Sequence, residues 1–139
     1  MSSLFVDTSG WASLFIHFQT YYPQAEQYFR LALQQKQKIY TTNYVIAELV
    51  ALLNSPLRIS RSRVFEIGDA IKLVNYVEVV HIDEATDALA WTLCKSRRDK
   101  AWSLVDCTSF IVMKHKGCQE ALTTDRHFEQ AGFVALLRS

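Results

Sequence analysis

The sequence has few cysteines, prolines and glycines, and it has no long apolar run. Its 139 residues include three cysteines, two prolines and four glycines. The cysteines are odd in number and show no Cys-x-x-Cys spacing, which excludes a disulfide framework and a zinc knuckle and indicates small core residues or chance surface thiols. No apolar stretch approaches the ~20 residues that span a bilayer, and no basic leader precedes the first apolar segment. We therefore expect a soluble, cytoplasmic protein without membrane contact.

A strong excess of one charge is also missing. Fifteen basic and fourteen acidic side chains give a net charge of +1, which by itself does not indicate a nucleic-acid-binding protein. The basic residues nevertheless gather in two segments, which either flank a site for a phosphate-bearing substrate or form solvated helix ends. These segments contain Arg58, Arg61 and Arg63, and Lys95, Arg97, Arg98 and Lys100.

Half of the residues are apolar, which suffices for a sizeable core in one compact domain over residues 1–139. Strands are expected over residues 4–7, 38–41, 77–82, 120–123 and 133–136. Helices are expected over residues 10–18, 24–35, 44–53, 84–95 and 104–116, with another opening at Ser60 and a brief one after Asp125. This alternation predicts an α/β fold with a parallel sheet that is covered on both faces.

Four acidic residues stand in or beside apolar runs, where a charge is costly unless it meets a cation or solvent. Asp7 ends the first predicted strand and Asp125 follows the fourth. Ligands on parallel sheets bind at the carboxyl ends of the strands. Glu48 is the only charge between residues 45 and 53, and Asp106 lies in the first turn of another apolar helix.

Each acid except Glu48 also has a purely structural interpretation. Asp7 and Asp125 are suited to cap the helices that follow them, and Asp106 favours the positive end of its helix dipole. Four acids in this arrangement are nevertheless hard to explain as independent caps. Carboxylates without a supporting His or Cys pair suit Mg²⁺ or Mn²⁺ rather than Zn²⁺, so together they predict a site for a hard divalent cation. Hydroxyl contacts are expected from Thr8, Ser9 and Thr124.

The segments around these acids resemble, in order, the acidic motifs of the PIN-domain nucleases. They are Val6-Asp7-Thr8-Ser9, Ala47-Glu48-Leu49, Leu104-Val105-Asp106 and Thr123-Thr124-Asp125-Arg126-His127-Phe128. The resemblance spans nearly the whole chain and implies a three-layer α/β/α sandwich with a central, mostly parallel sheet. It also implies hydrolysis of single-stranded RNA with Mg²⁺ or Mn²⁺. The family's metal-binding acids match Asp7, Glu48, Asp106 and Asp125.

A chain of this size resembles the VapC toxins of prokaryotic toxin–antitoxin pairs. That resemblance implies a metal-dependent endoribonuclease that commonly forms a homodimer and is inhibited by a small antitoxin protein. On this interpretation Asp7, Asp106 and Asp125 hold the ion or ions directly, and Glu48 is a ligand or orients the attacking water. A rim for substrate phosphates is expected from Arg58, Arg61, Arg63, Arg97, Arg98 and Lys100. Asp99 is expected to form a solvated ion pair with Arg98 or Lys100 rather than to join the site.

Two alternatives follow from the same residues. Asp-dependent phosphatases also place an aspartate at the end of the first strand, but they need a second aspartate where this chain has Ser9. A non-catalytic PIN-like module for RNA binding or scaffolding is the other alternative, although all four acids are present. Of the remaining residues, Trp102 is the best candidate for stacking on a base, whereas the four histidines share no metal spacing and are expected to be inert. These histidines are His17, His81, His115 and His127.

Overall fold

The structure is a computed structural model that describes residues 2–138. Within these residues one sheet of five parallel strands has the order β3-β2-β1-β4-β5. The strands are β1 (Ser3–Val6), β2 (Lys38–Thr42), β3 (Val77–Val80), β4 (Glu120–Leu122) and β5 (Val134–Ala135). The helices are α1 (Thr8–Phe15), α2 (Tyr22–Gln34), α3 (Asn43–Asn54), α4 (Arg61–Lys72), α5 (Glu84–Ser96), α6 (Leu104–Lys116) and α7 (Arg126–Gln130), and a 3₁₀ turn follows (Leu136–Arg138).

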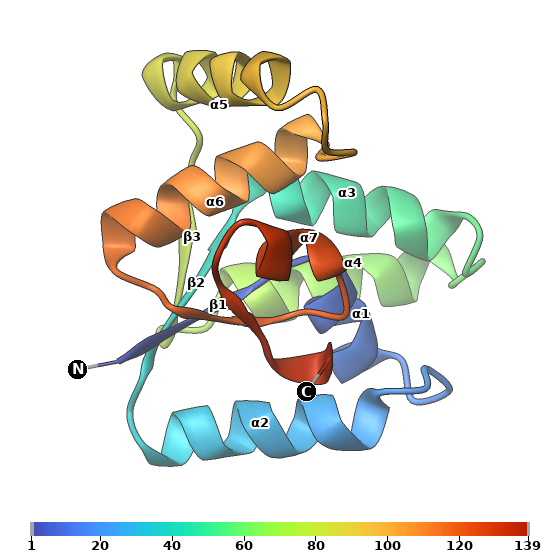
Figure 1. Cartoon of the computed structure of the whole chain (residues 1–139). Coiled ribbons are helices and arrows are strands. Elements are labelled where there is room, and N and C mark those ends of the chain that lie inside the picture. Colours follow the sequence, from blue (N-terminus) through green and yellow to red (C-terminus); the bar gives the residue numbers. More distant parts are fainter. Residues whose placement is uncertain (1, 139) are drawn as a thin grey trace.

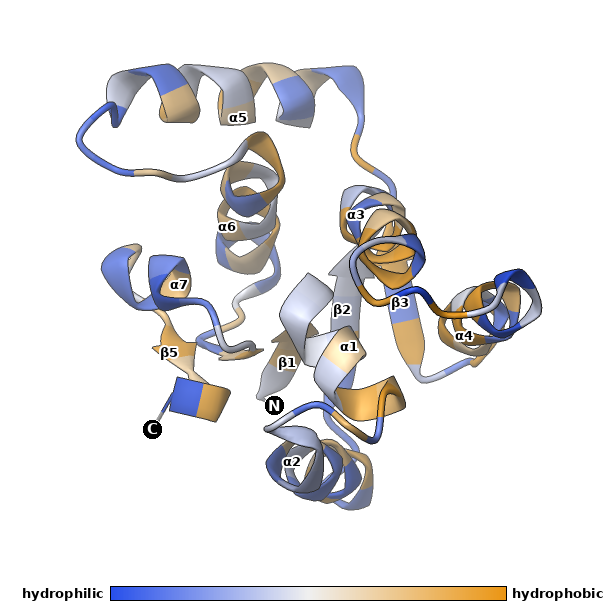
Figure 2. Ribbon diagram, turned by 90° about the vertical axis from the view of Figure 1, so that its right-hand side faces the viewer, coloured by the Kyte–Doolittle hydropathy of each residue, from blue (hydrophilic) through white to orange (hydrophobic). Residues whose placement is uncertain are grey.

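The helices cover the sheet on both faces. The strands pass between α2 on one side and α3 and α6 on the other, and α5 packs outside α6 (Figures 1 and 2). This arrangement confirms the predicted three-layer α/β/α sandwich. The parallel strands require helical crossovers, because a parallel neighbour cannot be reached through a tight turn.

The central strand β1 brings the ends of distant segments to one edge of the sheet. Its apolar residues are buried, with Phe5 and Val6 both at 0% exposure, as expected for a strand covered on both faces. Val6 pairs with Leu122 in the register between β1 and β4. The residues that follow these two strands, Asp7 and Thr123, therefore leave the sheet side by side.

Several helices end or begin at side chains or backbone conformations that cap them. Thr42, Ser60 and Asp83 each accept a hydrogen bond from a backbone N–H in the first turn of the helix that follows. Gly117 ends α6 in the left-handed conformation, with φ 73°. Helix α1 begins earlier than predicted, because Asp7 caps it directly at the end of β1.

Strand β3 is shorter than the sequence predicts. The apolar run from residue 77 to 82 indicated the strongest strand of the chain, but β3 ends at Val80 and lies at an edge of the sheet. Val80 pairs with Thr42, the last residue of β2, so β3 ends where its neighbour gives way to α3. The N–H of Ile82 then donates to the side-chain oxygen of Asn43, at the start of α3, at 2.8 Å.

The three cysteines form no disulfide among the described residues. All three cysteines are free thiols, and the Sγ atoms of Cys94 and Cys107 lie 3.1 Å apart between α5 and α6. Cys107 and Cys118 are buried, so they serve as small core residues.

Between residues 2 and 138, no helix combines the length and apolarity that a membrane crossing needs.

Gly10 is required by the close approach of α1 to β4. A Cβ atom added there would lie 2.0 Å from the carbonyl oxygen of Leu122, and backbone cannot move aside as a flexible side chain can. We expect Gly10→Ala to lower the free energy of unfolding by about 3 kcal/mol. Gly68 in α4 has no atom within 4 Å of the added Cβ, so Gly68→Ala is the matched control, expected to stabilise by up to about 1 kcal/mol. Equal urea midpoints for the two variants would contradict this packing.

Candidate metal centre and active site

The four predicted acids line one cleft at the carboxyl edge of the sheet. Asp7 follows β1, Asp125 lies three residues after β4, Asp106 is in the first turn of α6, and Glu48 is in the middle of α3. The cleft has a volume of about 240 Å³. Its other lining residues are Thr8, Ser9, Leu52, Val105, Ser109 and Phe128.

Asp7 is held on both of its oxygens. Oδ1 accepts from the N–H of Gly10 at 2.9 Å and from the hydroxyl of Ser9 at 2.8 Å. Oδ2 accepts from the hydroxyl of Thr123 at 2.7 Å. Because the residue is only 7% exposed, these donors replace the water that a carboxylate normally binds.

Burial has the largest effect on the pKa of Asp7. It raises the pKa of this carboxyl from 3.8 to about 7, against the lowering effect of the hydrogen bonds from Thr123, Gly10 and Ser9. The negative charge of Asp125 raises the pKa further. A cation in the cleft would oppose both raising effects, so the site is electrostatically prepared for one.

Asp106 belongs to a capping box at the start of α6. Its Oδ2 accepts from the N–H of Ser103 at 3.0 Å, and the Ser103 hydroxyl accepts from the N–H of Asp106. Burial raises the pKa of the Asp106 carboxyl above its ordinary value, and the charge of Asp125 adds to this. The capping bonds use Oδ2, and no hydrogen bond within residues 2–138 is recorded to Oδ1.

His127 joins the two acids on the α6 side of the cleft. Its Nδ1 lies 3.0 Å from Oδ2 of Asp106 and 3.2 Å from Oδ1 of Asp125. One ligand atom from each of the three residues lies within 4.8 Å of the others. Two carboxylates and one imidazole therefore converge closely enough to hold one divalent cation.

The capping roles and the convergence of the acids are compatible. Asp7, Asp106 and Asp125 each cap or begin a helix, as their structural interpretations predicted. Each of these helices starts at the same edge of the sheet, so the caps also meet in one cleft. The helix N-termini bring positive partial charge to the acids, which offsets part of the cost of burying their charges.

Glu48 faces the cleft from α3 and has one partner. The hydroxyl of Thr8 donates a short hydrogen bond to its Oε1. The residue is also exposed, so solvent and a hydroxyl, rather than a cation, meet this charge in the structure. Its second carboxylate oxygen has no recorded hydrogen bond within residues 2–138.

The donor set fits Mg²⁺ and Mn²⁺. Carboxylate oxygens suit both ions, and an imidazole is tolerated better by Mn²⁺ than by Mg²⁺. Asp106, Asp125 and His127 would hold the ion most directly. Asp7, with both oxygens already hydrogen-bonded, adds negative charge from the buried side of the cleft.

The hydroxyl network differs in detail from the one expected. Thr8 and Ser9, from which hydroxyl contacts were expected, line the cleft. Thr124 contributes its backbone N–H, which donates to the Ser9 hydroxyl at 2.9 Å. The threonine hydroxyl that joins the acids belongs to Thr123, which donates to Asp7 and accepts from the N–H of Asp125 at 3.0 Å.

His127 was expected to lie apart from any site, but the structure places it against Asp106 and Asp125. The residue is at the second position of α7, and its N–H donates to Asp125 Oδ1 at 2.9 Å. This turn directs the imidazole back toward the cap and toward Asp106. The available sequence signal was its spacing of two residues from an acid that follows a strand.

The residues of the two basic segments do not line the cleft, as far as residues 2–138 are described. On α4, Arg61 stacks on Phe65 and Arg63 pairs with Glu66.

The second basic segment contains the ion pair expected for Asp99. Asp99 pairs with Arg97 at 3.0 Å and with Lys100 at 4.0 Å. The solvated ion pair expected for Asp99 is thus present, although Arg97 takes the place proposed for Arg98. Arg58 lies in the turn between α3 and α4, and Arg98 donates to the carbonyl of Lys95.

We expect His127→Ala to weaken Mn²⁺ binding by about 10- to 100-fold and Mg²⁺ binding by less, because an imidazole contributes more to Mn²⁺ affinity. Isothermal titration calorimetry with each ion measures both effects. His115→Ala, at an exposed position near the end of α6, is the matched control and is expected to change neither affinity. Unaltered affinity of His127→Ala for both ions would remove His127 from the metal centre.

The parallel β/α architecture and the acidic cleft at the carboxyl edge of β1 and β4 are those of a PIN-like α/β/α protein. The PIN domain profile matches residues 4–134, and this chain belongs to the PIN domain family. The 23S rRNA-specific endonuclease VapC20 of two Mycobacterium tuberculosis strains is 35% identical over 131 residues, which cover 94% of this chain and 95% of the relative.

Solved structures agree with this assignment. The crystal structure of Mycobacterium tuberculosis VapC20, described as a sarcin-ricin loop cleaving toxin, superposes with a TM-score of 0.83 at 32% identity and covers 95% of this chain and 97% of that one. PAE2754 from Pyrobaculum aerophilum has a TM-score of 0.63 at 17% identity, covering 97% and 90% of the two chains. FitAcB from Neisseria gonorrhoeae has a TM-score of 0.65 at 15% identity, covering 95% and 94%. The last two similarities concern the fold alone.

Proposed function

We propose that this chain is a divalent-metal-dependent endoribonuclease that cleaves single-stranded RNA and acts as the toxin of a toxin–antitoxin pair. The observation that carries the proposal is the convergence of Asp7, Asp106 and Asp125, with Glu48 and His127, in one cleft. The 35% identity to VapC20 over nearly the whole chain supports the choice of RNA as substrate. VapC20 is described as specific for 23S rRNA and as cleaving the sarcin-ricin loop, so an RNA with this loop is the first substrate to test.

The mechanism assigns a separate role to each side of the cleft. A bound Mg²⁺ or Mn²⁺ supplies charge neutralisation at the scissile phosphate and lowers the pKa of the attacking water. Asp106, Asp125 and His127 would hold the cation from the α6 and α7 side. Glu48, anchored through Thr8, has a second carboxylate oxygen that can accept a proton from the attacking water. Asp7 stays fixed by its three donors and maintains the negative potential of the site.

The phosphatase alternative loses support from the geometry of Asp7. A nucleophilic aspartate needs an oxygen that can reach phosphorus. Both oxygens of Asp7 accept hydrogen bonds, and the residue is nearly buried. Ser9 stands where such phosphatases have a second aspartate, and its hydroxyl is one of the donors.

Cleavage of labelled RNA tests the proposal. Purified protein is incubated with a single-stranded RNA pool and with a sarcin-ricin loop RNA, in Mg²⁺, in Mn²⁺ or in EDTA. We expect cleavage with either ion and none in EDTA, and the sequenced ends then define the preferred site. Absence of cleavage on both substrates with both ions, in protein that binds RNA, would favour the non-catalytic RNA-binding module.

We further propose a small antitoxin protein as partner and a homodimer as the assembly. Support comes from the resemblance of this chain to VapC toxins. Sedimentation equilibrium of the purified chain measures the assembly. A monomer at all concentrations would contradict the homodimer.

A further inference from the structure

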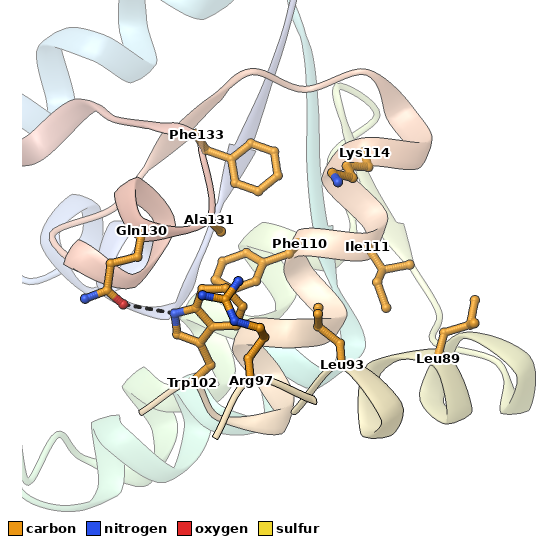
Figure 3. A pocket seen from close by; sticks show the side chains of 10 residues that line it. All are labelled: Leu89, Leu93, Arg97, Trp102, Phe110, Ile111, Lys114, Gln130, Ala131 and Phe133. Carbon is orange, nitrogen blue, oxygen red and sulfur yellow. Dashed lines mark hydrogen bonds between the residues drawn. The ribbon is translucent and has the colours of Figure 1, made fainter. Parts of the chain in front are cut away.

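A second groove lies beyond the metal centre, between α5, α6 and the segment that joins α7 to β5 (Figure 3). Its volume is about 410 Å³, within the range of small-ligand pockets. We propose that it binds one nucleotide of the RNA substrate, with the base against the aromatic wall and the adjoining phosphates near Arg97 and Lys114. This inference rests on the proposed function and names a substrate subsite for it.

The wall of the groove is aromatic and held in place. The ring of Trp102 packs edge-to-face on Phe110 with a centroid separation of 5.1 Å, and Phe110 packs on Phe133 at 5.8 Å. The indole N–H of Trp102 donates to Gln130 at 3.0 Å, which fixes the orientation of the ring (Figure 3). Fixed aromatic rings are the surfaces on which unpaired bases stack, whatever their sequence.

The charges around the groove suit a nucleotide. Its lining residues include two cations, Arg97 and Lys114, and no acid. The guanidinium of Arg97 lies over the Trp102 ring, 5.0 Å from its centroid, so a base that stacks on this face displaces the guanidinium toward the adjoining phosphate. Arg97 is paired with Asp99, whereas Lys114 is exposed and takes part in none of the ion pairs recorded for residues 2–138. Lys114 is therefore the freer cation for a phosphate.

The groove lies next to the metal centre, and packed side chains link their walls. Trp102 immediately precedes Ser103, whose N–H donates to Asp106. Phe110 follows Asp106 by one helical turn, a rise of about 6 Å. Phe110 also packs edge-to-face on Phe128 at 5.1 Å, and Phe128 lines the catalytic cleft while Phe110 lines the groove. A strand cleaved in the cleft can thus place a neighbouring nucleotide in the groove.

Tryptophan fluorescence reports occupation of the groove directly. Trp11 is buried at 1% exposure and Trp91 is exposed at 57%, so Trp91→Phe leaves Trp102 as the accessible indole. We expect a short single-stranded RNA, added in EDTA to prevent metal-dependent cleavage, to quench this fluorescence. An abasic oligonucleotide of the same length is expected to bind through its phosphates without quenching. Binding is followed in parallel by the anisotropy of a labelled RNA.

Charge removal at the groove gives a second readout. Lys114→Ala is expected to weaken RNA binding by about 3- to 10-fold and to reduce the salt slope of log K by about one. Lys72→Ala, an equal charge change at the end of α4, is the matched control and is expected to leave both quantities unchanged. RNA that binds without quenching Trp102, together with equal behaviour of the two lysine variants, would overturn the subsite.

Other outcomes separate this inference from the proposed function. Quenching by RNA without cleavage when Mg²⁺ or Mn²⁺ is added would preserve the subsite and contradict the nuclease. Quenching that depends on protein concentration and not on RNA would instead make the groove an interface between copies of this chain, and so contradict the subsite.

Discussion

Asp106→Asn is expected to lower the rate of RNA cleavage by at least about 100-fold while leaving the fold intact. The substitution removes one of the two carboxylates that meet His127, and with it the negative charge that holds a divalent cation. The amide oxygen of asparagine can still accept from the N–H of Ser103, so the start of α6 keeps its cap. Cleavage rates with saturating Mn²⁺ and circular dichroism spectra measure the two parts of this prediction.

The control for this variant is Asp69→Asn, an equal change at an exposed position of α4. It is expected to keep the wild-type rate, which excludes a general effect of lost negative charge. Cleavage by Asp106→Asn at the wild-type rate would show either that the activity comes from a contaminant or that the cation is held without Asp106.

Asp7 is expected to make the metal-free protein less stable as the pH rises. The pKa of this carboxyl is about 7 in the folded protein and 3.8 in the unfolded chain. Between these values the folded state binds more protons than the unfolded state, so the free energy of unfolding falls with increasing pH. The loss from Asp7 alone is roughly 4 kcal/mol over the range from about pH 4 to pH 7. Urea unfolding in EDTA across this range measures it.

Asp7→Asn isolates this effect from the other titrating groups. The asparagine oxygen can accept from Gly10 and Ser9, and its amide can donate to Thr123. We expect the variant to lose the pH-dependent decline that Asp7 causes and to be more stable than wild type near pH 7 without metal. Added Mg²⁺ is expected to stabilise wild type near pH 7 more than the variant. Parallel pH profiles of wild type and variant would refute an unfavourable buried charge at residue 7.

Local patterns in the sequence were sufficient for the elements and their order. The caps at Thr42, Ser60 and Asp83 have side chains that act on backbone one turn away, so their effect can be inferred from neighbouring residues. The end of β3 coincides with the end of its partner β2, and the N–H of Ile82 is taken up by Asn43, a residue 39 positions away. Such a contact exists only once the strands have paired, and no local pattern indicates it.

In the candidate site, too, local patterns were visible in the sequence, whereas contacts between distant residues were not. Four acids at strand ends and in apolar helices were recognisable because an isolated charge among apolar residues needs a reason. His127 and Thr123 were not. The role of His127 depends on how the five-residue helix α7 turns its side chain toward α6, and the role of Thr123 depends on the pairing of β4 with β1, which brings it beside Asp7. The basic segments were visible in the sequence, but the choice of which cation faces an aromatic groove required the packing of α5 against α6.

Anomalous diffraction from crystals of this chain soaked in Mn²⁺ tests the central claim most directly, because it locates the cation without reference to activity. The account predicts a manganese peak in the cleft between Asp106, Asp125 and His127, and no such peak in crystals of Asp106→Asn. A well-soaked crystal with no peak in this cleft, or with the same peak in the variant, would contradict a metal centre built from these acids.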